Sequence, residues 1–558
     1  MRHHRISLLT SFALVSVAAT ILPAQSRPPL DARDEYFAGS ELESYLRTLQ
    51  ILGLTPAHPW SLRQLSQREI DRLMPPGTAT HPWAARYAFS HAPRSRAYVR
   101  WLRPQVGARV NSAFPWGLND GAVWAGRGAT AWASGGFAAR WRAVSLVVDP
   151  IAFSAQNADF QIMDNGRPGA ERFGDGQFAG NVDYPQRFGD RPYTRLDPGE
   201  SFLRVDYAGA AVGVATSHEW WGPSQRFPYL LGTNAAGFPH VFVGTAHPAN
   251  LWLATLHGRV LWGRLDQSPY FQAAGPDSVL TRPRRFATGL VLALQPRGLG
   301  GLELGGARFF HAPWPDSGLP GRYIFRSFQG LLKSNLREEG GSIPTDDRSL
   351  DGENQLASVF ARFTVPAYGF EMYGELGRED HAWDGRDLML APDQYASVGF
   401  GFAKAWQRKG GRLTRLRGES IDFQPREIDK FRGGSGRPTY IHGAGSNQGH
   451  TQRGQILGAG VGVSSAAGAF LGLDRLSASG RWTLEWSRIV RQDRDAVAPQ
   501  AEAERRALDV VHSLAVERLL FWRGLDVLGG LSAAYDFNRD FAADRTNLSA
   551  YVSLTGRP

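Results

Sequence analysis

The chain has 558 residues with 64 Gly, 31 Phe, 16 Tyr, 17 Trp and no Cys, and its formal net charge is +10. The lack of cysteine excludes disulfide scaffolds, thiolate zinc sites, iron–sulfur clusters and Cys nucleophiles. With 42% hydrophobic residues the chain is not disordered, and no stretch beyond its leader approaches the roughly 20 apolar residues of a membrane helix. Two classes of protein remain compatible with this composition: a chain of several soluble domains, or a membrane protein built of β-strands.

The N-terminus has the layout of a secretory signal. A basic segment at residues 2–5 precedes an apolar run at 6–21 and the small-residue exit Pro23-Ala24-Gln25. We predict a signal peptide over residues 1–24. A membrane anchor is the alternative, which the short, Ser- and Thr-diluted run disfavours. Export without cysteine indicates a Gram-negative periplasm or outer membrane.

Residues 25–97 are predicted to form a periplasmic helical region. Ser40-Glu41-Leu42-Glu43 has the form of a capping box, and apolar residues recur at helical spacing until Gly53 ends the run. Ser66-Gln67-Arg68-Glu69 repeats the box before Pro75-Pro76. Two short amphipathic helices cannot bury a core of their own, so we expect them to pack on a larger structure.

From about Tyr98 the apolar period changes from 3.6 to 2. Arg481, Thr483, Glu485 and Ser487 alternate with Trp482, Leu484 and Trp486, and residues 547–554 alternate in the same way. A soluble sandwich also alternates, but it rarely spreads Trp and Phe over so many strands. An apolar exterior with aromatic girdles and a polar lumen accounts for both features. We therefore predict an all-β transmembrane barrel over residues 98–558, with some 16 to 18 antiparallel strands by length.

Long loops are predicted where Gly, Asp, Arg and Pro accumulate, at 164–200, 315–353 and 425–453. A helical turn is expected near 325–336. Long loops alternating with short turns are typical of the two sides of an outer-membrane barrel.

The sequence predicts no catalytic residue, metal site or cofactor. It contains no H-E-x-x-H, no P-loop and no G-x-S-x-G elbow. His442 and His450 flank a Gly-rich turn with no carboxylate at ligand spacing, which disfavours a metal site. We therefore expect the protein not to be an enzyme.

Four segments follow one another in a recognisable order. They are Glu219-Trp220-Trp221-Gly222-Pro223 with Asn234-Ala235 and Phe238-Pro239, residues 351–366, Glu375-Leu376-Gly377-Arg378-Glu379-Asp380-His381 with Arg386-Asp387, and residues 440–455. Together they resemble signatures of the capsule-assembly Wzi family. The resemblance implies an outer-membrane barrel of about 18 strands with periplasmic helices, and a lectin-like role in holding capsular or exopolysaccharide at the cell surface.

Candidate polysaccharide-binding residues follow from the resemblance and from sugar chemistry, because sugar rings offer apolar faces and many hydroxyls. Two groups combine aromatic or charged side chains in this way: Glu219, Trp220, Trp221 and Asn234, and Glu375, Arg378, Asp380 and Arg386. The structural alternatives are an interfacial Trp girdle for the first group and a salt-bridged, plugged lumen for the second.

Three classes of function remain open. A surface polysaccharide-binding barrel is the first choice, a porin or transporter for small solutes or oligosaccharides is the second, and an outer-membrane hydrolase is the third. The expected partners are capsular or extracellular polysaccharide and outer-membrane lipid, without nucleic acid, and the protein is expected to be monomeric.

Overall fold

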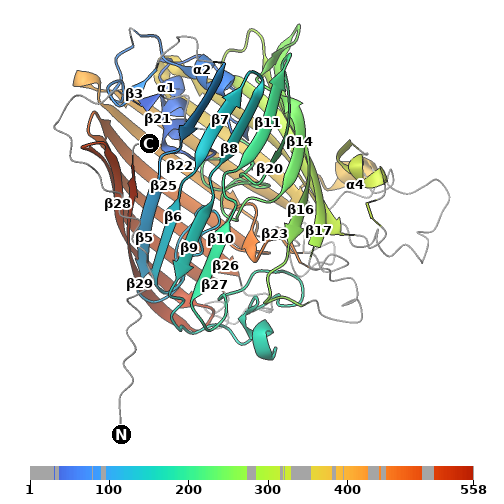
Figure 1. The fold of residues 1–558 in the computed structure, drawn as a ribbon. Coiled ribbons are helices and arrows are strands. Elements are labelled where there is room, and N and C mark those ends of the chain that lie inside the picture. The colour runs from blue at the N-terminus through green and yellow to red at the C-terminus, as the bar shows by residue number, and fades with distance from the viewer. Residues whose placement is uncertain are drawn as a thin grey trace.

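Alternating sequence from Ala97 onward produces antiparallel strands that close into a barrel (Figure 1). The computed structural model describes residues 30–31, 37–77, 79–89, 96–272, 284–314, 318–319, 321–328, 354–379, 385–393, 395–424, 439–441, 448–492 and 508–556. The predicted signal peptide and His442 lie outside these residues. The structural account below concerns the described residues only.

The barrel contains 23 strand segments. They are β4 (Ala97–Trp101), β5 (Gln105–Asn111), β6 (Gly128–Ser134), β7 (Phe137–Trp141), β8 (Val144–Val148), β9 (Ile151–Ala155), β10 (Tyr193–Asp197), β11 (Phe202–Tyr207), β12 (Ala210–Ala215), β14 (His240–Thr245), β15 (Ala249–Asn250), β16 (Ala254–Asp266), β17 (Arg284–Pro296), β18 (Leu302–Pro313), β19 (Asn354–Val365), β20 (Phe370–Glu379), β21 (Ala396–Gln407), β22 (Leu413–Asp422), β25 (Ala466–Ser477), β26 (Gly480–Gln492), β27 (Leu508–Trp522), β28 (Leu525–Arg539) and β29 (Ala543–Thr555).

Five pairs of segments are interrupted halves of one strand. β4 continues into β5, β6 into β7, β8 into β9, β10 into β11 and β14 into β15, so the 23 segments form 18 strands. Pro104, Pro150, Pro198 and Pro248 lie at four of the breaks, because proline has no N–H to donate to the ladder. β29 pairs with β5 and closes the ring. The predicted barrel of about 18 antiparallel strands is confirmed.

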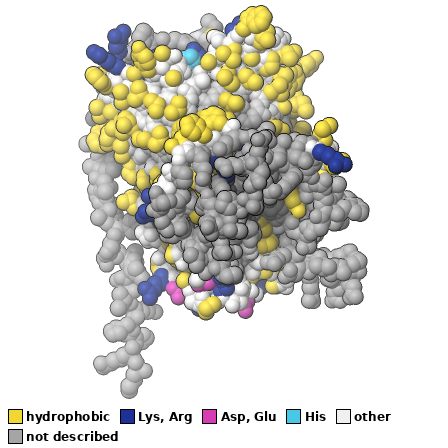
Figure 2. Space-filling view, turned by 90° about the vertical axis from the view of Figure 1, so that its right-hand side faces the viewer, with side chains coloured by type: hydrophobic (Ala, Val, Ile, Leu, Met, Phe, Trp, Pro, Cys, Tyr) yellow, Lys and Arg dark blue, Asp and Glu magenta, His cyan; other side chains and the backbone are white. Residues whose placement is uncertain are grey.

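The outer wall is apolar and the inner face polar, as the alternation predicts. On β26, Trp482 is 52% and Leu484 47% exposed, whereas Arg481 is 7% and Thr483 6% exposed. Figure 2 shows apolar side chains over most of the described part of one face. Among the described residues, no helix is long and apolar enough to cross a membrane. The fold is that of a transmembrane β-barrel.

The predicted helices are α1 (Glu41–Ile51) and α2 (Gln67–Leu73). Ser66 and Glu69 form the predicted capping box. Ser40 also caps its helix, but Glu43 accepts from the backbone N–H of Gly39 rather than of Ser40. Both helices lie at one end of the barrel, at the top of Figure 1. We call this the helical end.

The opposite end carries the loop of residues 156–192 between β9 and β10, and we call it the long-loop end. The helical end carries tight turns, among them 366–369, next to Leu52, and 523–524. Because outer-membrane barrels have short periplasmic turns and long external loops, we infer that the helical end faces the periplasm.

Short elements complete the fold. They are the two-stranded sheets β1 (Leu30–Asp31) with β3 (Tyr87–Ala88), β2 (Leu62–Arg63) with β13 (Trp220–Trp221) and β23 (Thr451–Gln452) with β24 (Gln455–Ile456), the helices α3 (Gly321–Ile324) and α4 (Gly385–Leu390), and the 3-10 turns η2 (Gly169–Phe173), η4 (Arg326–Phe328), η6 (Pro366–Tyr368) and η7 (Lys409–Gly411). The turn expected near 325–336 thus begins earlier, at Gly321, and residues 329–336 lie outside the described residues.

Candidate functional site

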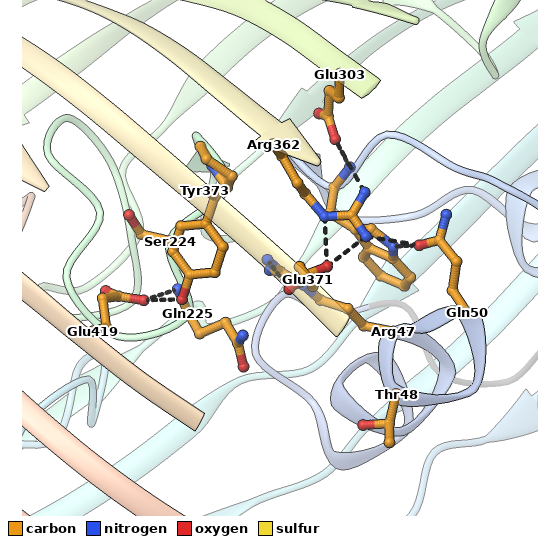
Figure 3. A network of polar contacts seen from close by, with 12 residues as sticks. Arg47, Thr48, Gln50, Ser224, Gln225, Glu303, Arg362, Glu371, Tyr373 and Glu419 are labelled. Carbon is orange, nitrogen blue, oxygen red and sulfur yellow. Dashed lines mark hydrogen bonds and ion pairs between the residues drawn. The ribbon is translucent and has the colours of Figure 1, made fainter. Parts of the chain in front are cut away.

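α1 is anchored inside the barrel mouth by buried ion pairs. Arg47 lies 2.8 Å from Glu371 of β20, and Arg362 of β19 lies 2.5 Å from the other oxygen of the same carboxylate (Figure 3). Arg362 also donates to Gln50 of α1 at 3.0 Å. Because these charged groups are at most 3% exposed, they are held by one another and not by water. The helical region therefore shares its packing with the lumen wall.

A second segment, residues 216–239, turns from the end of β12 into the lumen, and we call it the inward loop. Glu419 of β22 holds its bend, accepting from the backbone N–H groups of Gln225 at 2.6 Å and Phe227 at 2.6 Å and from the hydroxyl of Tyr373 at 2.6 Å (Figure 3). The carboxylate thus accepts hydrogen bonds from backbone N–H groups that would pair with a neighbouring strand if the loop continued the sheet.

Glycines in the wall make room for the rings of the inward loop. Trp221 lies over Gly289 and Tyr229 over Gly377, where a Cβ would overlap the ring. These rings belong to one buried cluster together with Phe309 of β18. Part of the high Gly and aromatic content is therefore explained by ring-on-glycine contacts inside the barrel.

The first predicted site group lies in this packing. Trp220 is 2% and Trp221 0% exposed, and β13, which contains both, pairs with β2. Burial alone would raise the pKa of Glu219, but Arg259 at 2.5 Å and His240 lower it to about 2. The predicted membrane girdle is wrong for these two rings, since they lie inside the barrel. Sugar binding by Glu219, Trp220 and Trp221 stays a prediction, and their burial favours a structural role.

The second predicted group is not brought together as expected. Glu375 is buried on the lumen face of β20, whereas Arg378, three residues on, falls on the opposite face. An odd separation along a strand forces this result, so the expected shared cluster is wrong for this pair. Arg386 is exposed on α4, and Asp380 lies outside the described residues. The lumen does contain buried ion pairs, but they are formed by other residues, among them Arg47, Arg362 and Glu371.

A cavity of about 250 Å³ opens at the long-loop end, and we call it the outer cavity. Its half-buried rings belong to Trp116, Trp124 and Tyr184. Asn234, a predicted site residue, also lines it and donates to the carbonyl of Ile456 at 2.9 Å. Aromatic faces beside amides and charged groups are the chemistry that a sugar ring requires.

The charges around the outer cavity have both signs. Asp120, Asp175 and Asp540 line it together with Arg491 and Arg539. Burial raises the pKa of Asp175, whose carboxylate accepts from the backbone N–H groups of residues 177 and 178. Among the described residues that line this cavity, three carboxylates and two guanidinium groups give no excess of positive charge that would select an acidic polymer.

A second cavity of about 510 Å³ lies toward the helical end, and we call it the inner cavity. Asn119 and Asp120 line both cavities, so residues 117–125 form the partition between them. An ion pair from Arg109 to Asp120 and a 2.7 Å hydrogen bond from the N–H of Gly121 to the carbonyl of Thr233 fix the partition. The lumen is therefore divided.

Four histidines are buried outside the barrel strands: His58, His81, His218 and His450. Burial lowers the pKa of His58 to about 3, of His81 to about 4 and of His450 to about 4. Burial alone would lower the pKa of His218, but the carboxylate of Glu200 raises it above its usual value. The Nε2–H group of His450 donates to the carbonyl of Leu230 at 2.6 Å. Among the described residues, no three His, Asp or Glu side chains lie together as a metal cluster.

Sequence reasoning missed the aromatic residues of the outer cavity and the filling of the lumen by α1 and the inward loop, which together we call the plug. Trp116 and Trp124 stand in a Pro- and Gly-rich interval whose fold depends on distant strands. The charges at Glu303, Arg362 and Glu371 were a usable signal, because they occupy the lumen face of strands with apolar outer faces.

Comparison with solved structures shows a similar fold in a bacterial outer-membrane protein. Wzi of Escherichia coli, described as an outer-membrane protein involved in group 1 capsule assembly and as a carbohydrate-binding β-barrel, aligns with a TM-score of 0.56 and 13% identity over 91% of this chain and 97% of its own.

Outer-membrane porins align less well. A BenF-like porin from Pseudomonas fluorescens gives a TM-score of 0.37 at 10% identity over 82% of this chain and 98% of its own. OprD from Pseudomonas aeruginosa gives 0.37 at 9% identity over 82% of this chain and 93% of its own. No protein-family model and no curated protein sequence matches the chain. The match to Wzi shows a fold similar to that of a bacterial outer-membrane barrel.

Proposed function

We propose that this protein is an outer-membrane barrel that binds capsular or extracellular polysaccharide at its long-loop end. The observation that carries the proposal is the combination of a filled lumen with the outer cavity. The inward loop and α1 occupy the space that a diffusion channel leaves to water, while the outer cavity presents aromatic rings, amides and carboxylates.

The fold similarity to Wzi supports this proposal, since that protein is described as carbohydrate-binding. Binding is assigned to Trp116, Trp124 and Asn234 of the outer cavity, whereas Trp220 and Trp221 hold the inward loop. Each half-buried ring presents one face for stacking on a sugar, and Gln455 and Gln492 in the lining offer hydrogen bonds to hydroxyls.

The alternative function is a porin or transporter. It shares every strand-level feature, and the inner cavity of about 510 Å³ would form half of its path if the partition moved. Conductance in planar bilayers comparable to that of an open porin would support this alternative. We expect wild-type conductance near the baseline of the bilayer. Neither the absence of enzymatic activity nor the monomeric state is tested, and both stay predictions.

Retention of surface polysaccharide by cells tests the proposal. Trp116→Ala and Trp124→Ala should each release polymer into the medium, because each removes one stacking face. Trp252→Ala is the matched control, since this ring is 85% exposed in a turn at the helical end. Heat-modifiable migration on gels verifies that each variant is folded. Full retention by folded Trp116→Ala and Trp124→Ala cells would refute the assignment to the outer cavity.

A further inference from the structure

The barrel wall is incomplete between β10 and β16. β12 ends at Ala215 and β14 begins only at His240, because the inward loop leaves the sheet between them. Beyond this level, β10 pairs with β9 alone and Leu265–Asp266 of β16 pairs with β17 alone among the described strands. We call this opening the wall gap.

The hairpin β23–β24 closes the wall gap from inside, and in Figure 1 β23 is seen between β10 and β16. Arg453 at its tip donates its backbone N–H to the carbonyl of Asp266 at 2.8 Å. Its guanidinium lies 3.0 Å from Asp197 of β10 and 3.2 Å from Asp266 of β16. One side chain thus ties together the two strand edges that the sheet leaves open.

An apolar groove of about 620 Å³ runs along the outer wall from the level of the wall gap toward the helical end. Leu203, Val214 and Val241 line it, and they are 43%, 48% and 44% exposed on the face that meets lipid. Trp262 and Trp314 lie at its other side, as aromatic residues do near a membrane interface. The missing strand segments leave a hollow here that a complete sheet would fill.

Positive charge gathers where the groove meets the wall gap. Among the described residues, four guanidinium groups and two carboxylates lie there: Arg195, Arg264, Arg284, Arg453, Asp197 and Asp266. Arg264 is 38% exposed and Arg284 is exposed on the outward face of β17, so both are within reach of a group outside the wall. Guanidinium groups beside an acyl-sized groove match a lipid with an anionic head.

We propose that the groove and the wall gap form a binding site for an anionic lipid in the external leaflet of the membrane. One acyl chain lies along Leu203, Val214 and Val241, and the phosphate meets Arg264 and Arg284. The position at the long-loop end places the head at the external interface. Polysaccharide binding is not required for this site.

Native mass spectrometry of the full-length protein in detergent tests the proposal. The probes are phosphatidylglycerol and phosphatidylcholine with identical acyl chains. We expect one phosphatidylglycerol to remain bound with at least fivefold higher occupancy than phosphatidylcholine. Equal occupancy of the two lipids in the wild-type protein would overturn the headgroup assignment.

Matched variants separate this site from lipid held all round the barrel. Val241→Trp fills the groove and should lower phosphatidylglycerol occupancy at least fivefold. Val243→Trp, 45% exposed on the same face of β14 but outside the groove, should leave it unchanged. Arg264→Gln with Arg284→Gln should abolish the preference for phosphatidylglycerol, whereas Arg518→Gln at the helical end should not. Wild-type occupancy in Val241→Trp, or equal loss in both Trp variants, would overturn the site.

Discussion

Glu371 is the carboxylate on which the docking of α1 depends most. It is fully buried and neutralises two guanidinium groups, Arg47 at 2.8 Å and Arg362 at 2.5 Å. Glu371→Gln keeps the shape but leaves both cations buried, with Glu303 at 3.4 Å from Arg362 as the remaining carboxylate. Breaking a buried pair on one side costs about 3–5 kcal/mol. We expect a loss of that size in the free energy of unfolding.

Equilibrium urea unfolding in detergent, followed by tryptophan fluorescence, measures this loss. In Glu371→Gln, hydrogen exchange should become faster in α1 than it is in the wild type, and it should change less in β25–β29. Asp190→Asn is the matched control, since its pair with Arg172 spans 3.6 Å and both side chains are more than half exposed. That change should cost less than about 1 kcal/mol. A Glu371→Gln loss as small as that of Asp190→Asn would refute the view that buried charges hold the plug.

Further changes test other parts of the fold. Trp221→Ala should cost about 3–5 kcal/mol in urea unfolding, because the ring is fully buried, and a loss below about 1 kcal/mol would contradict this. Gly377→Ala should cost about 1–3 kcal/mol, since its Cβ overlaps Tyr229. Arg453→Ala should speed hydrogen exchange at residues 451–456, and unchanged exchange would exclude its role as the closing contact. Lowering the pH from 7 to 5 should destabilise the protein. The folded pKa values of His58, His81 and His450 lie below 6.5, so their contribution to stability is present above pH 6.5 and lost toward pH 4, by about 1.4 kcal/mol per pH unit and histidine. The raised pKa of His218 acts in the opposite direction, but it is one group against three. Equal urea midpoints at pH 7 and pH 5 would contradict that prediction.

The strand alternation was sufficient to predict the barrel and the face of each side chain. Trp482 and Leu484 face outward and Arg481 and Thr483 inward because a period of two leaves no other arrangement on a closed sheet. The N-termini of α1 and α2, at Ser40 and Ser66, could also be predicted from the sequence, because capping depends only on residues within one helical turn.

The site depended on contacts that the sequence does not encode locally. Trp220 and Trp221 have the composition of a sugar platform, but the turn at Gly222 and the pairing of β13 with β2 bring them into the lumen. Which of the many carboxylates meets Arg362 is decided by the register of β18, β19 and β20 and by the docking of α1. Periodicity predicts the face of a residue, but not its partner across the barrel.

Equilibrium binding of the purified barrel to polysaccharide extracted from its own cells tests the central claim most directly. The wild-type protein should bind, and the double variant Trp116→Ala with Trp124→Ala should bind more than about 100-fold more weakly, since each stacked ring contributes about 2 kcal/mol. Trp252→Ala should match the wild type. No binding by the folded wild-type protein, or equal affinity in the double variant, would contradict the account.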